Sequence, residues 1–142
     1  MKILSVSIVI FYKELTKSSV KLWTQVRFDD GPFHGLLEFP GGKIEAGETP
    51  FEGGLREVKE EVDDKIDFSE AMLLGLYENL TATKRIILYP FLTEAHPLLE
   101  TKGEWLTIDF KELSEHLRGK IPHPNHQIID DLCRYLYDKQ HI

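Results

Sequence analysis

The sequence predicts an α/β domain in which helices pack against a mixed β-sheet. Two observations predict this class: apolar runs of strand length are spread along the chain, and other segments have the periodicity of amphipathic helices. A third is the length of 142 residues, which fits about one domain. No internal repeat, linker or low-complexity tract divides the sequence, so we expect a single domain over residues 1–142.

Six segments are predicted to be β-strands because they are rich in Ile, Val and aromatic residues. They cover residues 3–12, 20–28, 36–39, 71–80, 84–95 and 103–108. The first two are expected to pair as a hairpin. The segments 29–35 and 40–48 contain Gly and other turn-forming residues, and they are predicted to be loops.

Three helices are predicted, over residues 50–62, 109–119 and 124–139. The first is well specified, because Thr49 can be its N-cap, Pro50 occupies its first position and Glu52 completes a capping box. Its expected core-facing stripe consists of Leu55, Val58 and Val62. The last helix is expected to carry an apolar stripe of Ile128, Leu132, Tyr135 and Leu136.

Composition limits the class of protein. The formal net charge is -7, which disfavours broad nonspecific binding to nucleic acid or to anionic membranes. Cys133 is the only cysteine, so no intrachain disulfide can form and a reducing compartment is favoured. The apolar run near the N-terminus is too short to span a bilayer, and no small-residue cleavage site follows it, so a cytoplasmic location is predicted.

Glutamates gather on the predicted helix 50–62, on the side opposite its apolar stripe. Glu57 lies three residues before Glu60 and four before Glu61, so their Cβ atoms are neighbours and their charges repel. Such a run is usually a solvated surface face. Here only Lys59 is close enough to relieve the repulsion, and a glycine-rich loop directly precedes the helix. The pattern therefore favours a site for a hard divalent cation such as Mg²⁺, which prefers carboxylates, water and phosphate oxygens.

Residues 42–61 match the pattern G-x5-E-x7-R-E-U-x-E-E, in which U is an aliphatic residue. The matching positions are Gly42, Glu48, Arg56, Glu57, Val58, Glu60 and Glu61. On this signature the chain resembles the Nudix hydrolase family. The resemblance implies the Nudix fold, a mixed β-sheet sandwiched between α-helices. It also implies hydrolysis of a nucleoside diphosphate linked to another group, with Mg²⁺ as cofactor and Mn²⁺ as a substitute.

The resemblance assigns roles to individual residues. The glutamates that bind metal or position the attacking water correspond to Glu57, Glu60 and Glu61, and Gly41 and Glu100 to further metal ligands. Glu48 and Arg56 correspond to the pair that ties the loop to the helix. The chain departs from the signature at Asp63, where the family usually has glycine. Such a glycine ends a helix in the left-handed conformation, which Asp tolerates better than most residues, so we expect an altered helix exit there and not lost catalysis.

Within the family the chain is most similar to the MutT-type nucleoside triphosphate pyrophosphohydrolases. The similarity rests on LLEFPGGKIEAGETP, KGEWLTI and PHPNHQII. It suggests substrate contacts from Arg27, Gly42, Lys43, Arg85 and Asn125, with Asn125 reading the edge of a guanine. The residues alone leave other roles open. Asn125 can be the N-cap of the last helix, Arg27 a surface residue of its strand, and Arg85 an ordinary hairpin charge.

Three functions remain open on the sequence. We expect an Mg²⁺-dependent pyrophosphohydrolase that cleaves GTP, dGTP or 8-oxo-dGTP to the monophosphate and pyrophosphate. An RNA 5′-pyrophosphohydrolase would use the same signature on 5′-triphosphate RNA, and the net charge of -7 weakly disfavours only a long RNA track. A non-catalytic nucleotide-binding module is the third, and the intact R-E-U-x-E-E disfavours it. The expected partners are therefore a nucleoside triphosphate or an RNA 5′ end, and no membrane.

Overall fold

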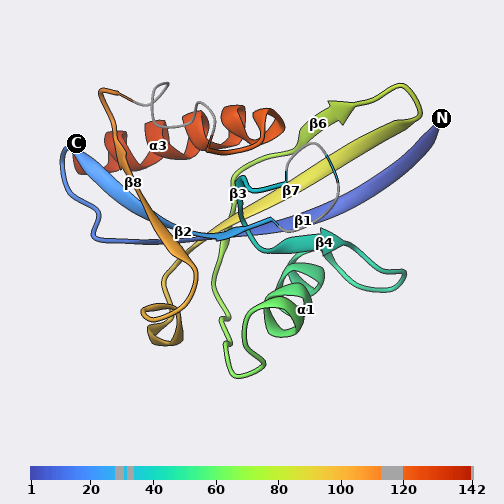
Figure 1. Cartoon of the computed structure of the whole chain (residues 1–142), viewed down its shortest axis with the longest axis horizontal. Coiled ribbons are helices and arrows are strands. Elements are labelled where there is room, and N and C mark those ends of the chain that lie inside the picture. Colours follow the sequence, from blue (N-terminus) through green and yellow to red (C-terminus); the bar gives the residue numbers. More distant parts are fainter. Residues whose placement is uncertain (28–30, 32–33, 113–119, 142) are drawn as a thin grey trace.

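The computed structural model describes residues 1–27, 31, 34–112 and 120–141, and a mixed β-sheet is its main feature (Figure 1). The strands are β1 (Lys2–Lys13), β2 (Ser19–Val26), β3 (Leu37–Glu38), β4 (Gly41–Lys43), β5 (Met72–Leu73), β6 (Tyr77–Leu80), β7 (Lys84–Glu94) and β8 (Glu104–Asp109). The described helices are α1 (Pro50–Glu61) and α3 (His126–Gln140), with the 3-10 segments η1 (Pro97–Leu99) and η2 (His123–Asn125). None of these helices is long and apolar enough to cross a membrane.

The centre of the sheet is the parallel pair β1 and β7, which run side by side over almost their whole lengths (Figure 1). Every other described pairing is antiparallel. β2 and β4 pair with β1, β5 and β6 pair with β7, and β3 and β8 pair with β2. The sheet is therefore mixed, as the sequence predicts.

The two helices cover opposite faces of the sheet (Figure 1). Side chains alternate between these faces along β1, so the strand contributes to two apolar cores. Ile8 and Ile10 join the core beneath α3, while Val9 and Phe11 join the core beneath α1. This confirms the predicted arrangement of a mixed sheet between helices.

The predicted strands are confirmed with two differences. Residues 71–80 form two short strands, β5 and β6, with Gly75 at a positive φ of 155° in the gap between them. Residues 41–43, predicted as loop, pair with residues 6–8 as β4. The sequence predicts a helix over residues 109–119. Asp109 is instead the last residue of β8, and residues 113–119 lie outside the described part of the chain.

The predicted core stripe of α1 is wrong at Leu55. Val58 is fully buried, but Leu55 is only half-buried and belongs to neither core. Gly54 occupies the buried side of the helix instead, and a Cβ placed on it would lie 2.7 Å from Ser7 Oγ and 3.0 Å from Val9 Cγ2. The helix approaches β1 through Gly54. A helical wheel that considers only large apolar side chains does not predict this contact.

The stripe predicted on α3 is wrong at Tyr135, which is 41% exposed. Its predicted apolar partners are buried, and Ile129 and Cys133 are buried beside them. The first two turns of this stripe therefore bury two adjacent positions each, and the buried face of the helix is broader than the predicted stripe there.

The exit of α1 is altered from the one that a glycine would give, as the sequence predicts. No described non-glycine residue other than Glu14 has a positive φ, so Asp63 is not left-handed. Its carboxylate accepts a hydrogen bond from the Lys65 amide at 2.9 Å and faces Lys102 Nζ at 3.3 Å. A side-chain turn of this kind gives the backbone an alternative to the helix, so glycine is not needed here.

Candidate active site

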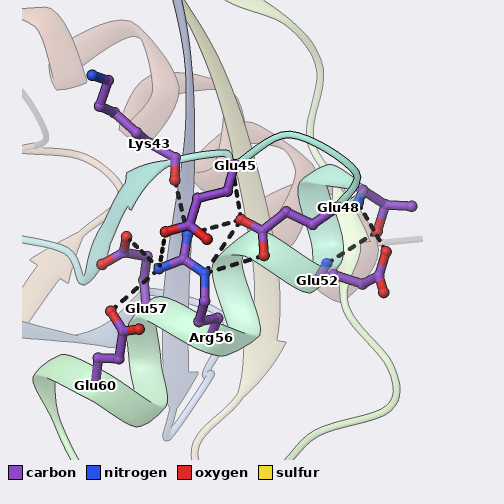
Figure 2. A network of polar contacts seen from close by, with 8 residues as sticks. Lys43, Glu45, Glu48, Glu52, Arg56, Glu57 and Glu60 are labelled. Carbon is purple, nitrogen blue, oxygen red and sulfur yellow. Dashed lines mark hydrogen bonds and ion pairs between the residues drawn. The ribbon is translucent and has the colours of Figure 1, made fainter.

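The start of α1 is fixed by the capping box that the sequence predicts. Thr49 Oγ1 accepts a hydrogen bond from the Glu52 amide at 3.1 Å, and Glu52 Oε1 accepts one from the Thr49 amide at 2.8 Å (Figure 2). Pro50 occupies the first turn. These contacts set where the helix begins, and hence which residues of the next two turns face the glycine-rich strand β4.

Arg56 connects this helix to the loop that precedes it (Figure 2). Its guanidinium donates to Glu48 from Nη2 at 2.8 Å and from Nε at 3.1 Å, and Nη2 also donates to the Lys43 carbonyl at 2.9 Å. The bonds from Arg56, with one from the Glu45 amide, hold the pKa of Glu48 below its usual range. Such planar, multiply bonded contacts fix geometry as well as charge.

Glu57 lies against β4. Arg56 Nη1 donates to its Oε1 at 3.0 Å, and only 14% of its side chain is exposed. A Cβ placed on Gly42 would lie 2.5 Å from Glu57 Cδ, so the carboxylate occupies the space that any side chain at Gly42 would need. Glycine at this position therefore lets the carboxylate reach the β4 backbone.

Glu61 brings a second carboxylate to the same strand. Its Oε2 accepts hydrogen bonds from Gln25 Nε2 at 3.1 Å and from the Gly41 amide at 3.4 Å. Loss of water around this carboxylate, followed by a hydrogen bond shared with Glu57, raises the pKa of Glu61 to about 7. The carboxylates of Glu57 and Glu61 are therefore close enough that the charge on one disfavours ionisation of the other.

Glu60 is the most exposed of the three glutamates. Its carboxylate accepts from Arg56 Nη1 at 3.2 Å, and 60% of its side chain is exposed (Figure 2). The three predicted glutamates therefore remain neighbours, with Glu57 and Glu61 against β4 and the more exposed Glu60 sharing Arg56 Nη1 with Glu57.

The donor set suits a divalent cation. Among the described residues no three acidic, His or Cys side chains stand in a ready metal-binding arrangement. However, Arg56 reaches only one of the paired carboxylates, since it donates to Glu57 at 3.0 Å and makes no described contact with Glu61. Mg²⁺ needs only one or two protein carboxylates when waters and substrate phosphates complete its shell. The residues present therefore fit such an ion.

A hollow of about 320 Å³ opens on the other side of β4, towards α3. Gly41 and Gly42 line it, and so do two further predicted substrate contacts, Arg27 and Asn125. Its apolar walls are formed by Val6, Ile8, Phe39, Ile86, Leu88, Pro122 and Pro124. Residues distant in sequence, from β1 to the start of α3, thus share one cavity.

Asn125 occupies the N-cap position of α3, but its side chain makes no capping hydrogen bond. The amide is therefore not used by the helix, which is the alternative role that the sequence leaves open. Arg27 is ion-paired with Glu38, with 3.4 Å between Nε and Oε2.

Three predicted site residues lie apart from the hollow and from the paired carboxylates. Lys43 is exposed and its ammonium points away from Arg56 (Figure 2). Arg85 pairs with Glu78 on the β6–β7 hairpin. Glu100 pairs with Lys13 at 2.8 Å. Lys13 is five residues along β1 from the position that pairs with β4, a separation of roughly 17 Å at the usual strand rise.

Two polar residues that line the 320 Å³ hollow, Glu38 and Asn79, were not predicted from the sequence. Glu38 lies in LEFPGG directly before the signature, so its proximity to the loop was a usable signal. Asn79 on β6 carries no local motif, and only the pairing of β6 with β7 brings it to the hollow. A larger hollow of about 720 Å³, between Phe51 and Tyr135, is lined by none of the predicted site residues.

Two bacterial proteins are similar to about half of this chain. YtkD of Bacillus subtilis (strain 168) is 38% identical over 86 residues, 56% of this chain and 51% of its own length. A Proteus vulgaris protein named 8-oxo-dGTP diphosphatase is 39% identical over 71 residues, 49% of this chain and 62% of its own length. The matches therefore span between half and two thirds of these relatives.

Solved structures show the same fold. The MutT NUDIX hydrolase from Burkholderia pseudomallei has a TM-score of 0.63 at 16% identity, over 97% of this chain and 98% of that one. The C. elegans Ap4A hydrolase has a TM-score of 0.67 at 12% identity, over 94% of this chain and 98% of that one. The NUDIX domain model matches residues 1–132, which is most of the sequence. The chain therefore belongs to the Nudix family.

Proposed function

We propose that the protein is a Mg²⁺-dependent pyrophosphohydrolase that cleaves the triphosphate of a guanine nucleotide, releasing the monophosphate and pyrophosphate. GTP, dGTP and 8-oxo-dGTP are the candidate substrates, and Mn²⁺ is a substitute metal. The single buried cysteine, Cys133, fits work in the reducing cytoplasm.

The observation that carries the proposal is the position of Gly41 and Gly42. Both line the 320 Å³ hollow, and on their other side they contact the paired carboxylates of Glu61 and Glu57. A nucleotide with its base in the hollow can therefore extend its phosphates past two glycines towards the acidic pair. Glycines at this point allow phosphate oxygens to approach the backbone closely.

The chemistry assigns each group a task. A bound Mg²⁺ would neutralise phosphate charge and acidify a coordinated water. Glu57 and Glu61 would hold the metal, and one of these carboxylates would orient or deprotonate the attacking water. Glu48 and Arg56 hold Glu57 in place from behind. Glu60, which shares Arg56 Nη1 with Glu57, and Glu100, which pairs with Lys13, are the further proposed metal ligands.

The guanine preference is supported by Asn125 and by the relatives. An amide offers both a donor and an acceptor, and the Asn125 amide is not used for capping. The Proteus vulgaris relative, and an Escherichia coli (strain K12) relative 56% identical over 36 residues, 25% of this chain and 28% of its own length, are both named 8-oxo-dGTP diphosphatase.

The direct test is hydrolysis by the purified protein with Mg²⁺. GTP, dGTP, 8-oxo-dGTP, ATP and a 5′-triphosphorylated RNA oligonucleotide are compared by kcat/KM, and pyrophosphate is distinguished from phosphate as the product. A guanine nucleotide should be the best substrate, with pyrophosphate released. Preference for the RNA would contradict this proposal and indicate an RNA 5′-pyrophosphohydrolase. Absence of turnover with every substrate would indicate a non-catalytic binding module.

The metal site is tested by Glu57→Gln and Glu61→Gln. Each should lower kcat/KM by roughly 100-fold or more at saturating Mg²⁺. Glu61→Gln should not lower the melting temperature without metal, because it removes a charge from a repulsive pair. In Glu57→Gln the relief of the same repulsion offsets the weaker contact with Arg56 Nη1, so its melting temperature should stay near that of wild type. Glu112→Gln, at an exposed glutamate after β8, is the control and should behave as wild type. Near wild-type turnover in either site variant would contradict the metal placement.

The base-reading role is tested by Asn125→Ala. The wild type should prefer GTP over ATP by roughly 10-fold or more, since mismatched buried polar groups cost a site that much. The variant should lose this preference by weakening GTP while ATP hydrolysis barely changes. A lower melting temperature with unchanged selectivity would instead assign Asn125 to the helix start.

A further inference from the structure

Asn79 is a second amide in the same hollow as Asn125. It lies on β6, is half-buried, and lines the cavity together with the glycines of β4. Neither amide side chain has a hydrogen-bond partner among the described residues. Both amides are half-buried, so their donors and acceptors remain available to a ligand that enters the hollow.

The direction in which Asn79 points is fixed by its strand. Burial alternates along β6, with Tyr77 and Asn79 half-buried and Glu78 and Leu80 exposed. Side chains two residues apart share a face of the sheet. Tyr77 Oη donates to Asp131 Oδ2 on α3 at 2.7 Å, so the face of β6 that carries Asn79 is the one turned towards α3.

The same contact ties β6 to the helix that begins at Asn125. Asp131 also accepts from Gln127 Nε2 at 2.9 Å, so its carboxylate is held by residues of both elements. Figure 1 shows β6 beside the first turns of α3. Because this bond joins β6 to α3, the positions of Asn79 and Asn125 relative to one another are determined by the fold and not by a flexible loop.

The two amides suit a particular class of ligand. Each presents one carbonyl acceptor and one NH₂ donor. Around them the walls of the hollow are apolar, as at Phe39, Ile86 and Leu88. Flat apolar walls with a few convergent donors and acceptors favour a heteroaromatic base whose edge alternates donors and acceptors.

We propose that Asn79 is a second specificity-determining residue, which reads the edge of the base together with Asn125. This inference rests on the proposed function, because it assigns the hollow to the base of the nucleotide. Recognition is then divided between a strand and a helix start. A base that satisfies one amide but not the other is bound less well, so the discrimination exceeds what Asn125 alone provides.

The test uses Asn79→Ala, Asn125→Ala and the double variant, with Leu80→Ala as control on the exposed face of the same strand. Hydrolysis of GTP, ITP and ATP is measured, together with calorimetric binding of the α,β-methylene analogues of GTP and ATP. Asn79→Ala should lower kcat/KM for GTP by about 10-fold, mainly through KM, and change ATP by less than about 2-fold. Because both amides read one base, the effects of the single variants should not multiply in the double variant.

A structural role for Asn79 predicts something else. It would reduce GTP and ATP alike and lower the melting temperature, with the GTP to ATP ratio unchanged, and this result would overturn the inference. If Asn79→Ala keeps the wild-type preference for GTP over ATP, the base-reading role of Asn79 is wrong, while the proposed function stands. Binding of both analogues with equal affinity by the wild type would also overturn the inference, even if hydrolysis upholds the proposed enzyme. Absence of both hydrolysis and binding would overturn the proposed function and the inference together.

Discussion

The Glu57 carboxylate lies in the space that a side chain on Gly42 would occupy, since a Cβ there would be 2.5 Å from Glu57 Cδ and Oε1. Gly41, one residue earlier, is close to backbone instead, and its Cβ would overlap the Ser7 carbonyl oxygen. The two neighbouring glycines are therefore required for different reasons, one by the acidic pair and the other by the pairing of β4 with β1.

This difference predicts opposite outcomes for two alanine variants. Gly42→Ala should fold with little loss of stability, because a flexible carboxylate can move, but its activity should fall by roughly 10-fold or more as Glu57 is displaced. Gly41→Ala should lower the melting temperature, because a backbone carbonyl cannot move without disrupting the β1–β4 pairing. Melting curves and kcat/KM on both proteins check this. Equal losses of stability would show that the contact with Glu57 is not what requires Gly42.

The orientation of α1 predicts that Val58 matters more than Leu55. Val58→Ala removes a fully buried side chain and should cost roughly 2 kcal/mol of unfolding free energy. Leu55→Ala removes a half-buried side chain outside both cores and should cost less than about 1 kcal/mol. Urea denaturation of the two variants measures both values. A larger loss for Leu55→Ala would restore the orientation that the helical wheel predicts.

The ion pair of Glu48 with Arg56 predicts a pH-dependent contribution to stability. Because hydrogen bonds from Arg56 lower the pKa of Glu48, its contribution is present above the usual value near 4.5 and is lost as pH falls through the native pKa. Glu48→Gln should therefore melt below wild type at pH 7, and the two proteins should converge in acid. Glu112→Gln should match wild type throughout. A gap that stays constant down to pH 3 would contradict the assignment.

Two buried hydroxyls predict contrasting effects. Ser7 Oγ is buried with no hydrogen-bond partner among the described residues, so Ser7→Ala should leave stability unchanged or raise it by up to about 1 kcal/mol. Thr24 is equally buried but donates to the Glu104 carbonyl at 2.8 Å. Thr24→Val should cost about 1 to 3 kcal/mol. Thermal or urea unfolding of both variants decides, and a destabilised Ser7→Ala would reveal a partner for that hydroxyl.

The sequence by itself determined the local structure. Strands follow from runs of Ile and Val, and the start of α1 follows from Thr49, Pro50 and Glu52, because capping and alternation act over a few residues. The signature over residues 42–61 also identified the family, since its spacing is set along one loop and one helix. Contacts within that segment, such as Glu48 with Arg56, could be expected for the same reason.

Tertiary structure decided what depends on residues far apart in sequence. The glycines of α1 set how closely it approaches β1, and the resulting orientation of the helix buries Val58 and leaves Leu55 outside both cores. The site of Asn79 depends on the pairing of β6 with β7 and on the bond from Tyr77 to Asp131, 54 residues apart. Such contacts arise from packing between elements, which the periodicity of a single segment does not encode. For this reason the acidic pair could be anticipated from the sequence, while the second amide of the hollow could be found only in the fold.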